Sequence, residues 1–320
     1  MITHSEHIDK VFEIAESPKA AALSRLAASW SRSISKYGLH PGEYRDPERI
    51  DGSLLKHKQD ELDYFIKTAS PHLDTLFQLV GKPGLGVLLT DDNGVVLDRR
   101  CKNSDLDEFK CWGLWPGTIW NESTEGTNGV GTCLAENRQV IIHRNEHFLA
   151  RNTGISCIDA PIYNAEGNLL GVLDVSSARA DQNHKLNLMI SALVSEAAFR
   201  IEIDLFRKAY SNSRIMILPN DTDNLKSLVA FNDDDLVVGA TRSARKRYEI
   251  PIGTEIKPCL LSNLDNKSNG DAFIQAERKV IVQTLARTNN NVSEAARLLS
   301  IGRATLYRRM KKLHITNKHQ

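Results

Sequence analysis

Cysteine is scarce in this sequence, and long apolar runs are missing. The five cysteines are odd in number and widely spaced, and they form no Cys-x-x-Cys pair; they are Cys101, Cys111, Cys133, Cys157 and Cys259. This spacing argues against a disulfide framework and against a structural zinc site. Residues 1–10 are polar and charged, unlike a signal peptide, and no apolar run reaches membrane-spanning length. We therefore expect a cytoplasmic location and no membrane partner.

Signatures of catalysis are also missing. The Gly- and Thr-rich stretch at residues 115–132 is not followed by Gly-Lys-Ser/Thr, so it is not a phosphate-binding P-loop. No base is readable beside any thiol. His143 and His147 lie four residues apart, a spacing that can hold a metal on a helix, but this segment leaves a predicted strand. We therefore favour a structural or pocket role for both and expect no catalytic residue, no metal and no cofactor.

The near-neutral total charge hides an uneven distribution. The chain has 41 Lys and Arg and 40 Asp and Glu, but residues 272–320 hold ten of the former and two of the latter. A basic tail therefore follows an acidic body. That asymmetry is typical of a nucleic-acid-binding arm.

The tail contains a pattern of two short helices joined by a tight turn. Residues 291–313 read NVSEAARLLSIGRATLYRRMKKL. Asn291 can cap the first helix, with Glu294 completing a capping box. Four apolar residues then recur at i, i+3, i+4 and i+7: Val292, Ala295, Ala296 and Leu299. Residues 299–302 are short enough to turn the chain sharply.

The second helix is strongly basic on one face. Leu306, Met310 and Leu313 share the opposite face and should pack inward. The candidate DNA-binding residues are Arg303, Ala304, Thr305, Tyr307, Arg308, Lys311 and Lys312. Small and hydroxyl side chains let the backbone approach base edges, Arg can bond guanine, and Lys neutralises phosphate. We expect double-stranded DNA as a partner.

Residues 276–313 resemble the Fis-type helix-turn-helix at the C-terminus of many bacterial enhancer-binding regulators. Ser300 stands where these turns commonly have Gly, and Gly302 where a Ser cap is common. An apolar face on the preceding helix is broader than one small tail can bury; its residues are Phe273, Ala276, Val280, Ile281 and Leu285. We therefore expect a homodimer that binds a pseudo-palindromic operator.

Upstream of residue 210 the pattern is that of an α+β domain. Helices are expected at 18–37, at 54–80 with a bend or new turn at Pro71, and at 184–210. Strands are expected at 86–90, 95–97, 140–143, 159–163 and 169–175, with an Asn-Gly hairpin turn at 93–94. The first two helices are either packing or dimerisation elements, or an extra layer on the domain's own core.

The segment from residue 125 to residue 176, which includes the second hairpin, carries several motifs. Residues 125–132 read EGTNGVGT, residues 143–148 read HRNEHF, residues 157–162 read CIDAPI and residues 171–176 read GVLDVS. With SWSRS at 29–33 and GLHP at 38–41, these motifs look like the GAF sensor of acetoin-catabolism (AcoR-type) regulators over residues 20–210. GAF domains of this kind commonly bind a small effector between sheet and loop.

That resemblance implies a pocket for an unidentified small-molecule effector. We expect the long loop at 115–132 to be functional, and its two tryptophans to wall the pocket. The candidate pocket residues are Trp115, Trp120, Thr127, Asn128, Cys133, His143, His147, Phe148, Cys157 and Asp159. Asp159 and Asp174 border strands, and we interpret both as carboxylates that cap the backbone rather than as general bases.

The fold class predicted is α+β: a GAF domain with an antiparallel sheet flanked by helices, with N-terminal helices and a C-terminal all-α helix-turn-helix. The expected segments are a helical segment packing on the sensor (1–80), the GAF sensor (81–210), a partial PAS-like connector and linker (211–270) and the helix-turn-helix domain (271–320). Residues 263–270 should form a flexible hinge.

AcoR-type regulators normally carry an ATPase between sensor and Fis-like tail. Here the interval is too short, and neither a Walker A sequence nor a GAFTGA-like loop is present. The resemblance therefore implies regulation without ATP-dependent sigma-54 activation, with RNA polymerase or another regulator as a further partner. Two alternatives stay open: a DNA-tethered adaptor whose GAF domain binds a protein, and a cysteine-based redox sensor.

Overall fold

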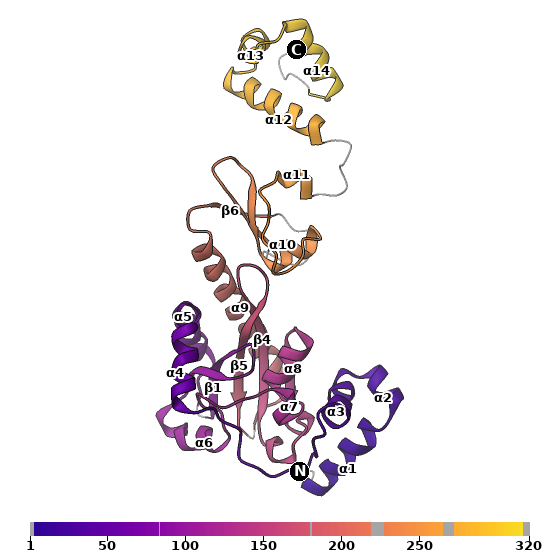
Figure 1. Ribbon diagram of the computed structural model, residues 1–320, viewed down its shortest axis with the longest axis vertical. Coiled ribbons are helices and arrows are strands. Elements are labelled where there is room, and N and C mark those ends of the chain that lie inside the picture. The colour runs from indigo at the N-terminus through magenta and orange to yellow at the C-terminus, as the bar shows by residue number, and fades with distance from the viewer. Residues whose placement is uncertain (1–2, 83, 180, 219–226, 265–271, 316–320) are drawn as a thin grey trace.

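The computed structural model describes residues 3–82, 84–179, 181–218, 227–264 and 272–315. Three units follow one another along the long axis in Figure 1: a large α+β body, a small connector and a helical C-terminal domain. Across the described residues, every helix is too short or too polar to cross a bilayer.

The body is built on a five-stranded antiparallel sheet in the order β2-β1-β5-β4-β3. The strands are β1 Leu85–Asp91, β2 Val96–Arg100, β3 Val140–His143, β4 Ser156–Tyr163 and β5 Leu169–Ser177. Both predicted hairpins are confirmed, and Gly94 turns the first with φ of +80°. Every residue of β1 is buried because helices cover both faces of the sheet.

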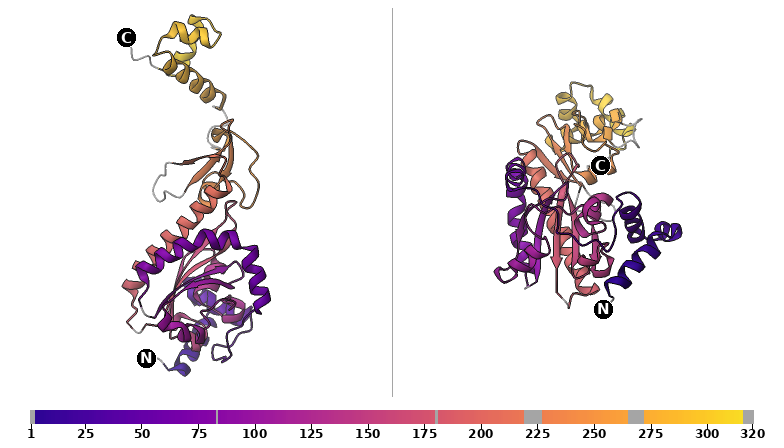
Figure 2. Two further views of the ribbon diagram at one scale, coloured as in Figure 1. Left: turned by 90° about the vertical axis from the view of Figure 1, so that its left-hand side faces the viewer. Right: turned by 60° about the horizontal axis from the view of Figure 1, so that its bottom comes forward.

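One face of the sheet is covered by α5 (Asp63–Val80) and by the C-terminal helix of the body, α9 (His184–Ala209), as the left view of Figure 2 shows. The chain enters α5 from α4 (Gly52–Glu61) through a break at Leu62. Of the two outcomes expected at Pro71, the new turn was wrong, because α5 continues through this residue. Pro71 and Lys67, whose carbonyl loses its helical partner, are both exposed, so water can satisfy that carbonyl.

The opposite face is covered by short helices, and two of them, which begin at 122 and 129, start inside the long loop expected at 115–132. These elements are η1 Asn103–Asp105, α6 Leu106–Cys111, α7 Glu122–Glu125, α8 Gly129–Glu136, η2 Arg144–Glu146 and η3 Ala150–Asn152. The amide side chains start the helices at 122 and 129: Asn121 accepts from the Thr124 amide at 2.9 Å and Asn128 from the Gly131 amide at 2.8 Å. The loop prediction failed because glycines weakened the helical pattern.

Three N-terminal helices pack against the edge of the body. They are α1 His4–Ala15, α2 Pro18–Leu23 and α3 Arg25–Ser35. The single helix expected at 18–37 is interrupted at Ser24, and α1 was missed because its sequence is mostly polar. Val11 and Trp30 bury against Phe148 and Leu149, and the Trp30 indole donates to the Glu146 carbonyl at 3.0 Å.

The connector is a folded module with its own core. Its elements are β6 Arg214–Ile217, β7 Leu228–Phe231, β8 Val237–Ala240, α10 Arg242–Arg247 and α11 Leu261–Leu264, with sheet order β6-β7-β8. Val229, Val237 and Ala244 are fully buried in it. Residues 265–270 of the predicted hinge lie outside the described residues.

The C-terminal domain consists of α12 (Ala272–Arg287), α13 (Val292–Leu298) and α14 (Arg303–Lys312). Its core joins the three inward residues predicted for the second helix, Leu306, Met310 and Leu313, to the stripe of the first. The predicted α+β class with a helical tail is confirmed.

Candidate functional site

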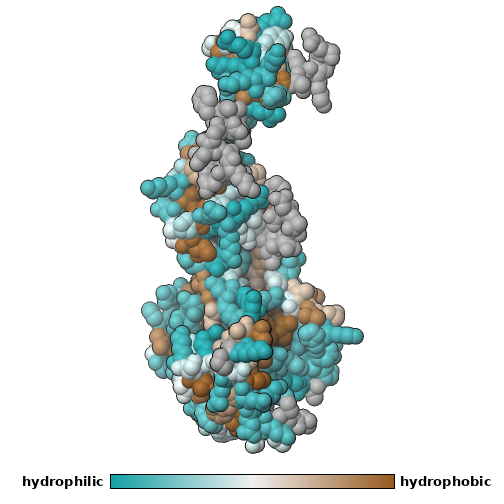
Figure 3. Space-filling model, turned by 90° about the vertical axis from the view of Figure 1, so that its right-hand side faces the viewer, coloured by the Kyte–Doolittle hydropathy of each residue, from teal (hydrophilic) through white to brown (hydrophobic). Residues whose placement is uncertain are grey.

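Helix α14 presents the basic face predicted from the sequence. Of the candidate DNA-binding residues, Arg303, Ala304, Tyr307, Arg308, Lys311 and Lys312 are exposed, and Thr305 is half-buried. Arg309, which was not a candidate, pairs with Glu277 of α12 at 2.8 Å. The C-terminal unit is mostly hydrophilic on the side shown in Figure 3. Helix α14 therefore offers cations and small side chains together on its outer side.

The turn before α14 holds a residue in a left-handed conformation. Ser300 has φ of +52°, where the related motif commonly uses Gly. A side chain with a Cβ is disfavoured there. Gly302 caps α14 without a side-chain hydrogen bond. The two departures from the family pattern thus fall at the joint that sets the direction of α14.

We expect Ser300→Gly to raise the free energy of unfolding of the C-terminal domain by roughly 0.5–1 kcal/mol, because glycine adopts a positive φ without strain. Hydrogen exchange of α13 and α14 amides in the full chain measures this. Ser293→Gly, in the first turn of α13, should lower the same quantity by roughly 0.5 kcal/mol. Equal signs for the two variants would contradict the strain at Ser300.

The apolar face assigned to dimer formation needs correction. Ile281 and Leu285 are 2% and 4% exposed and pack inside the domain's own core. Val280 stays exposed, and so does its neighbour Val282. The side chains of Phe273 and Ala276 lie outside the described part of the chain. The face left for a partner is therefore narrower than the sequence pattern indicated.

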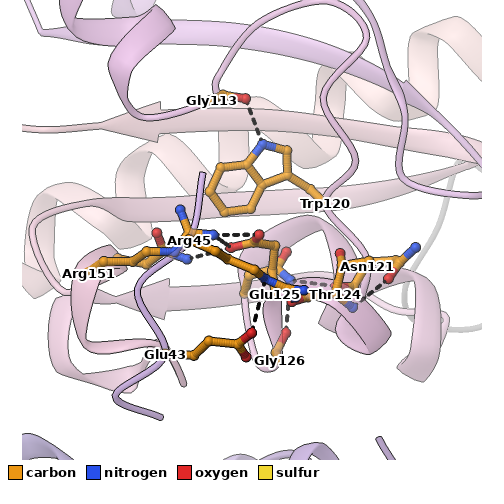
Figure 4. Close-up of polar contacts among 11 residues, drawn as sticks. Glu43, Arg45, Gly113, Trp120, Asn121, Thr124, Glu125, Gly126 and Arg151 are labelled. Atoms are coloured by element: carbon orange, nitrogen blue, oxygen red, sulfur yellow. Dashed lines mark hydrogen bonds and ion pairs between the residues drawn. The ribbon is translucent and has the colours of Figure 1, made fainter. Parts of the chain in front are cut away.

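The two tryptophans do not wall a common pocket. Trp115 lies under the Arg99 guanidinium, 3.7 Å from its ring centroid, and beside Lys110. Trp120 is buried in the core, and its indole donates to the Gly113 carbonyl at 2.9 Å (Figure 4). Trp115 therefore contacts two cations and Trp120 fills the core under α8. Neither ring has the predicted role of walling an effector pocket.

Several other pocket candidates come together between α8 and the sheet. Cys157 Sγ lies 3.5 Å from His147 Nε2 and 3.3 Å from Ser176 Oγ. Ser176 Oγ also donates to Asp174 Oδ2 at 2.8 Å. Asp159 is the cross-strand partner of Asp174, and both carboxyl groups are buried. We call these five residues the sensor's polar interior.

Helix α8 can approach this polar interior because its first residue is glycine. A Cβ on Gly129 would lie 2.0 Å from Asp159 Oδ2 and 2.4 Å from Cys157 Cβ. Cys133, a fully buried candidate, sits one turn further along the same helix. Gly129 of the EGTNGVGT motif therefore serves the packing of α8 on the sheet.

The carboxylates of the polar interior do not cap backbone, which corrects our interpretation. Both oxygens of Asp159 and one of Asp174 have no hydrogen-bond partner within the described structure. Burial raises the pKa of Asp174 to about 7, and burial together with the Asp174 charge raises the pKa of Asp159 well above its usual range. At least one of the pair is thus protonated well into the pH range where an ordinary carboxyl is ionised.

The remaining candidates have structural contacts. Thr127 Oγ1 lies 2.6 Å from Ser29 Oγ of α3, and Asn128 caps α8. Phe148 packs on the N-terminal helices, and His143 Nδ1 lies 2.7 Å from Ser156 Oγ. Their part in a ligand site stays a prediction.

The buried thiols are poor nucleophiles. Burial raises the pKa of Cys133 and of Cys157 well above the usual value, and the nearby Asp159 and Asp174 raise both further. A thiolate is the reactive form, so neither residue has the electropositive surroundings of a redox sensor.

Two buried ion pairs were missed by sequence reasoning. Glu122 of α7 accepts from Arg32 of α3 at 2.6 and 2.8 Å, and Glu125 accepts from Arg151 at 2.6 Å on both oxygens. Figure 4 shows Arg151 at Glu125, and Arg45 at the preceding residue, Thr124, whose carbonyl it binds. Their partners lie 26 or more residues apart in sequence, so only the fold reveals the pairing.

Comparison with known protein families identifies one domain in the sensor and one at the C-terminal end of the chain. The profile of the GAF domain matches residues 65–201, and the profile described as bacterial regulatory protein, Fis family, matches residues 274–313. The sensor match begins inside α5, which agrees with the packing of that helix in the sheet's core.

Among curated proteins, the chain is 30% identical over 260 residues to the acetoin catabolism regulatory protein of Cupriavidus necator, covering 78% of this chain and 39% of that protein. It is 31% identical over 182 residues to the acetoin dehydrogenase operon transcriptional activator AcoR of Bacillus subtilis, covering 57% and 30%. The chain thus spans well under half the length of these relatives.

Among solved structures, the chain resembles one from the E. coli DhaR(N)-DhaL complex. The TM-score is 0.52 at 12% identity, over 74% of this chain and 80% of that one. This likeness concerns the fold.

Proposed function

We propose that this chain, which joins a GAF domain to a Fis-type helix-turn-helix and is related to the AcoR-type regulators, is a DNA-binding regulator of transcription. The observation that carries the proposal is the outward face of α14. There Arg308, Lys311 and Lys312 are exposed beside Ala304, on a helix anchored from behind by Leu306 and Met310. Such a helix can enter the major groove with its cations free for bases and phosphates.

The mode of regulation does not include ATP hydrolysis. Residues 202–273, which lie between the two matched domains, hold the end of α9 and the connector, and no Walker A sequence occurs in the chain. AcoR-type regulators usually have an ATPase in this interval, and its absence leaves promoter occupancy or recruitment of RNA polymerase or another regulator. Purified protein should show no DNA-stimulated ATP turnover, and measurable turnover would contradict this.

The GAF domain supplies the signal in this proposal. A small-molecule effector would bind the sensor and favour one arrangement of two C-terminal domains in a homodimer, because a ligand shifts only those states that it binds unequally. The protein would act in the cytoplasm on a pseudo-palindromic operator. Capture and sequencing of bound DNA fragments, with and without cell extract, tests operator and effector together.

On the captured operator, Arg308→Ala should weaken binding by roughly 1–3 kcal/mol and relax preference at one base position, because bidentate base contacts discriminate by that amount. Lys312→Ala should instead weaken binding evenly across sequences and flatten its salt dependence. Fluorescence anisotropy at several salt concentrations measures both.

The matched control is Lys185→Ala on α9, an exposed cation in the sensor. It should leave operator affinity and its salt dependence unchanged. If Arg308→Ala and Lys312→Ala behave like this control, α14 does not lie in the groove.

A further inference from the structure

A cleft of about 660 Å³ opens on the body at the junction of four segments far apart in sequence, one of them represented by His4 of α1. Residues 44–47, which follow the N-terminal helices, form one side, and residues 144–154 form another. Trp112, just after α6, lies between them. The lining contains none of the ten predicted pocket residues. Its size suits a small organic molecule, since such pockets measure roughly 300–1,000 Å³.

The lining is cationic. Three arginines face the cleft, Arg45, Arg144 and Arg151, whereas Asp46 is the single acidic residue in the lining and is exposed. Behind the wall, Glu125 is fully buried and binds Arg151 through both oxygens. The lining itself therefore carries three guanidinium groups against one exposed carboxylate, while Glu125 pairs with Arg151 and Glu43 pairs with Arg45 from outside the lining.

Donors in this wall are left without acceptors. The Nε groups of Arg45 and Arg151 are buried and make no hydrogen bond. The nearest carboxylate oxygen to Arg45 Nε, on Glu43, is 3.6 Å away. Arg144 uses one terminal nitrogen on the Arg179 carbonyl at 2.7 Å. Buried donors of this kind normally have a partner, and a guanidinium fits a carboxylate in particular.

Aromatic groups border the same cleft. The Trp112 ring packs over Gly154, where an added Cβ would lie 2.6 Å from the indole. Tyr44 is 90% exposed and reaches no core cluster. A flat apolar wall and a free aromatic ring next to cations suit a ligand with a planar body and an anionic end.

We propose that this cleft binds a small planar organic carboxylate. The carboxylate is held by Arg45 with Arg151 and Arg144, and the planar body lies against Trp112 under Tyr44. Arg45 also donates to the Thr124 carbonyl at the end of α7 (Figure 4), so an occupied cleft joins the N-terminal segment to the layer that covers the sheet. The proposal concerns the sensor and does not depend on DNA binding by α14.

Isothermal titration of the full chain with benzoate tests the proposal, with benzamide as the neutral isostere. Benzoate should bind saturably with one site per chain and raise the melting temperature, whereas benzamide should do neither. Arg45→Gln should weaken benzoate binding by about tenfold or more, because a charged hydrogen bond is removed. Tyr44→Ala should also weaken benzoate binding, and because the Tyr44 side chain is exposed, its removal leaves the fold intact.

The control is Arg49→Gln, four residues along the same segment. Arg49 is exposed, donates to the Lys110 carbonyl and lies outside the cleft lining. It should leave benzoate binding unchanged. Absence of benzoate binding, equal binding of benzamide, or an equal loss in all three variants overturns the proposal. Because none of these measurements uses DNA, failure here leaves the proposed role of α14 standing, and failure of DNA binding leaves the cleft standing.

Discussion

Glu125→Ala should lower the free energy of unfolding of the sensor by about 3–5 kcal/mol, the usual cost of removing one partner of a buried ion pair. The substitution leaves the Arg151 guanidinium, whose side chain is 11% exposed, without its bidentate partner. It also removes the acceptor of the Asn152 amide at 3.0 Å. Burial raises the pKa of Glu125 even beside Arg151, so the pair is held at a real desolvation cost.

Urea unfolding monitored by circular dichroism measures this loss. The double variant Glu125→Ala/Arg151→Met should recover part of it, because no unpaired charge then remains. Asp60→Ala is the surface control: Asp60 pairs with Lys56 on α4, and both side chains are more than 60% exposed. It should change stability little. A double variant less stable than Glu125→Ala alone would contradict the unpaired-charge explanation.

Asp159→Asn should make the sensor more stable than the wild type at pH 8, with an advantage that disappears toward pH 4. In the folded state the pKa of Asp174 is raised to about 7 and that of Asp159 is also raised, whereas the unfolded chain has ordinary carboxyls. The native state therefore keeps protons that the unfolded chain releases. Stability is full below the unfolded pKa and falls as the pH rises through the folded values.

Asp159→Asn replaces one of the two buried carboxyls by a neutral amide of nearly the same shape, so only Asp174 can still ionise in this pair. Each tenfold change in proton affinity is worth about 1.4 kcal/mol, so a difference of at least that size is expected between pH 4 and pH 8. Burial lowers the pKa of His147 to about 4, which destabilises the fold in acid for both proteins. The difference between variant and wild type cancels that contribution.

Thermal melts at matched pH values give the difference directly. Asp60→Asn, on the exposed side of α4, serves as the control and should show no pH-dependent difference of this size. If the curves for Asp159→Asn and wild type stay parallel from pH 4 to pH 8, the two buried carboxyls do not share the interior as the structure places them.

The regular elements could be predicted because their signals are local. Strand β3 at Val140–His143 is the one predicted, since its apolar run is short and bounded. The Asn-Gly turn fixed the first hairpin, and the helix-turn-helix followed from an apolar stripe, a turn and a basic face. Each of these signals spans fewer than thirty residues of sequence.

The interior of the sensor depends on register, which the sequence does not reveal. Asp159 faces Asp174 only because β4 and β5 pair in that particular alignment. A shift of one residue in either strand would send the carboxyl of that strand to the other side of the sheet. Trp115 and Trp120 carry the same residue type five positions apart, yet one lies on the surface and the other in the core. The sequence offers no local signal that distinguishes the environment of Trp115 from that of Trp120.

The cationic cleft was beyond sequence reasoning for a different reason. Arg45, Trp112 and Arg151 come from three segments, each unremarkable in isolation. No periodicity links them, because the chain passes through several elements between one and the next. Only the tertiary fold shows that the two arginines lie together beside the Trp112 ring.

Helix α9 has 26 residues and therefore extends about 39 Å. From Ile190 to Leu205 the helix packs in the core of the sensor, and just beyond that Phe206 packs with Leu228 and Ala230 of the connector. A tilt of about 10° at the sheet displaces the far end by about 7 Å. A small tilt of α9 on the sheet would therefore displace the connector further than it displaces the residues at the start of the helix.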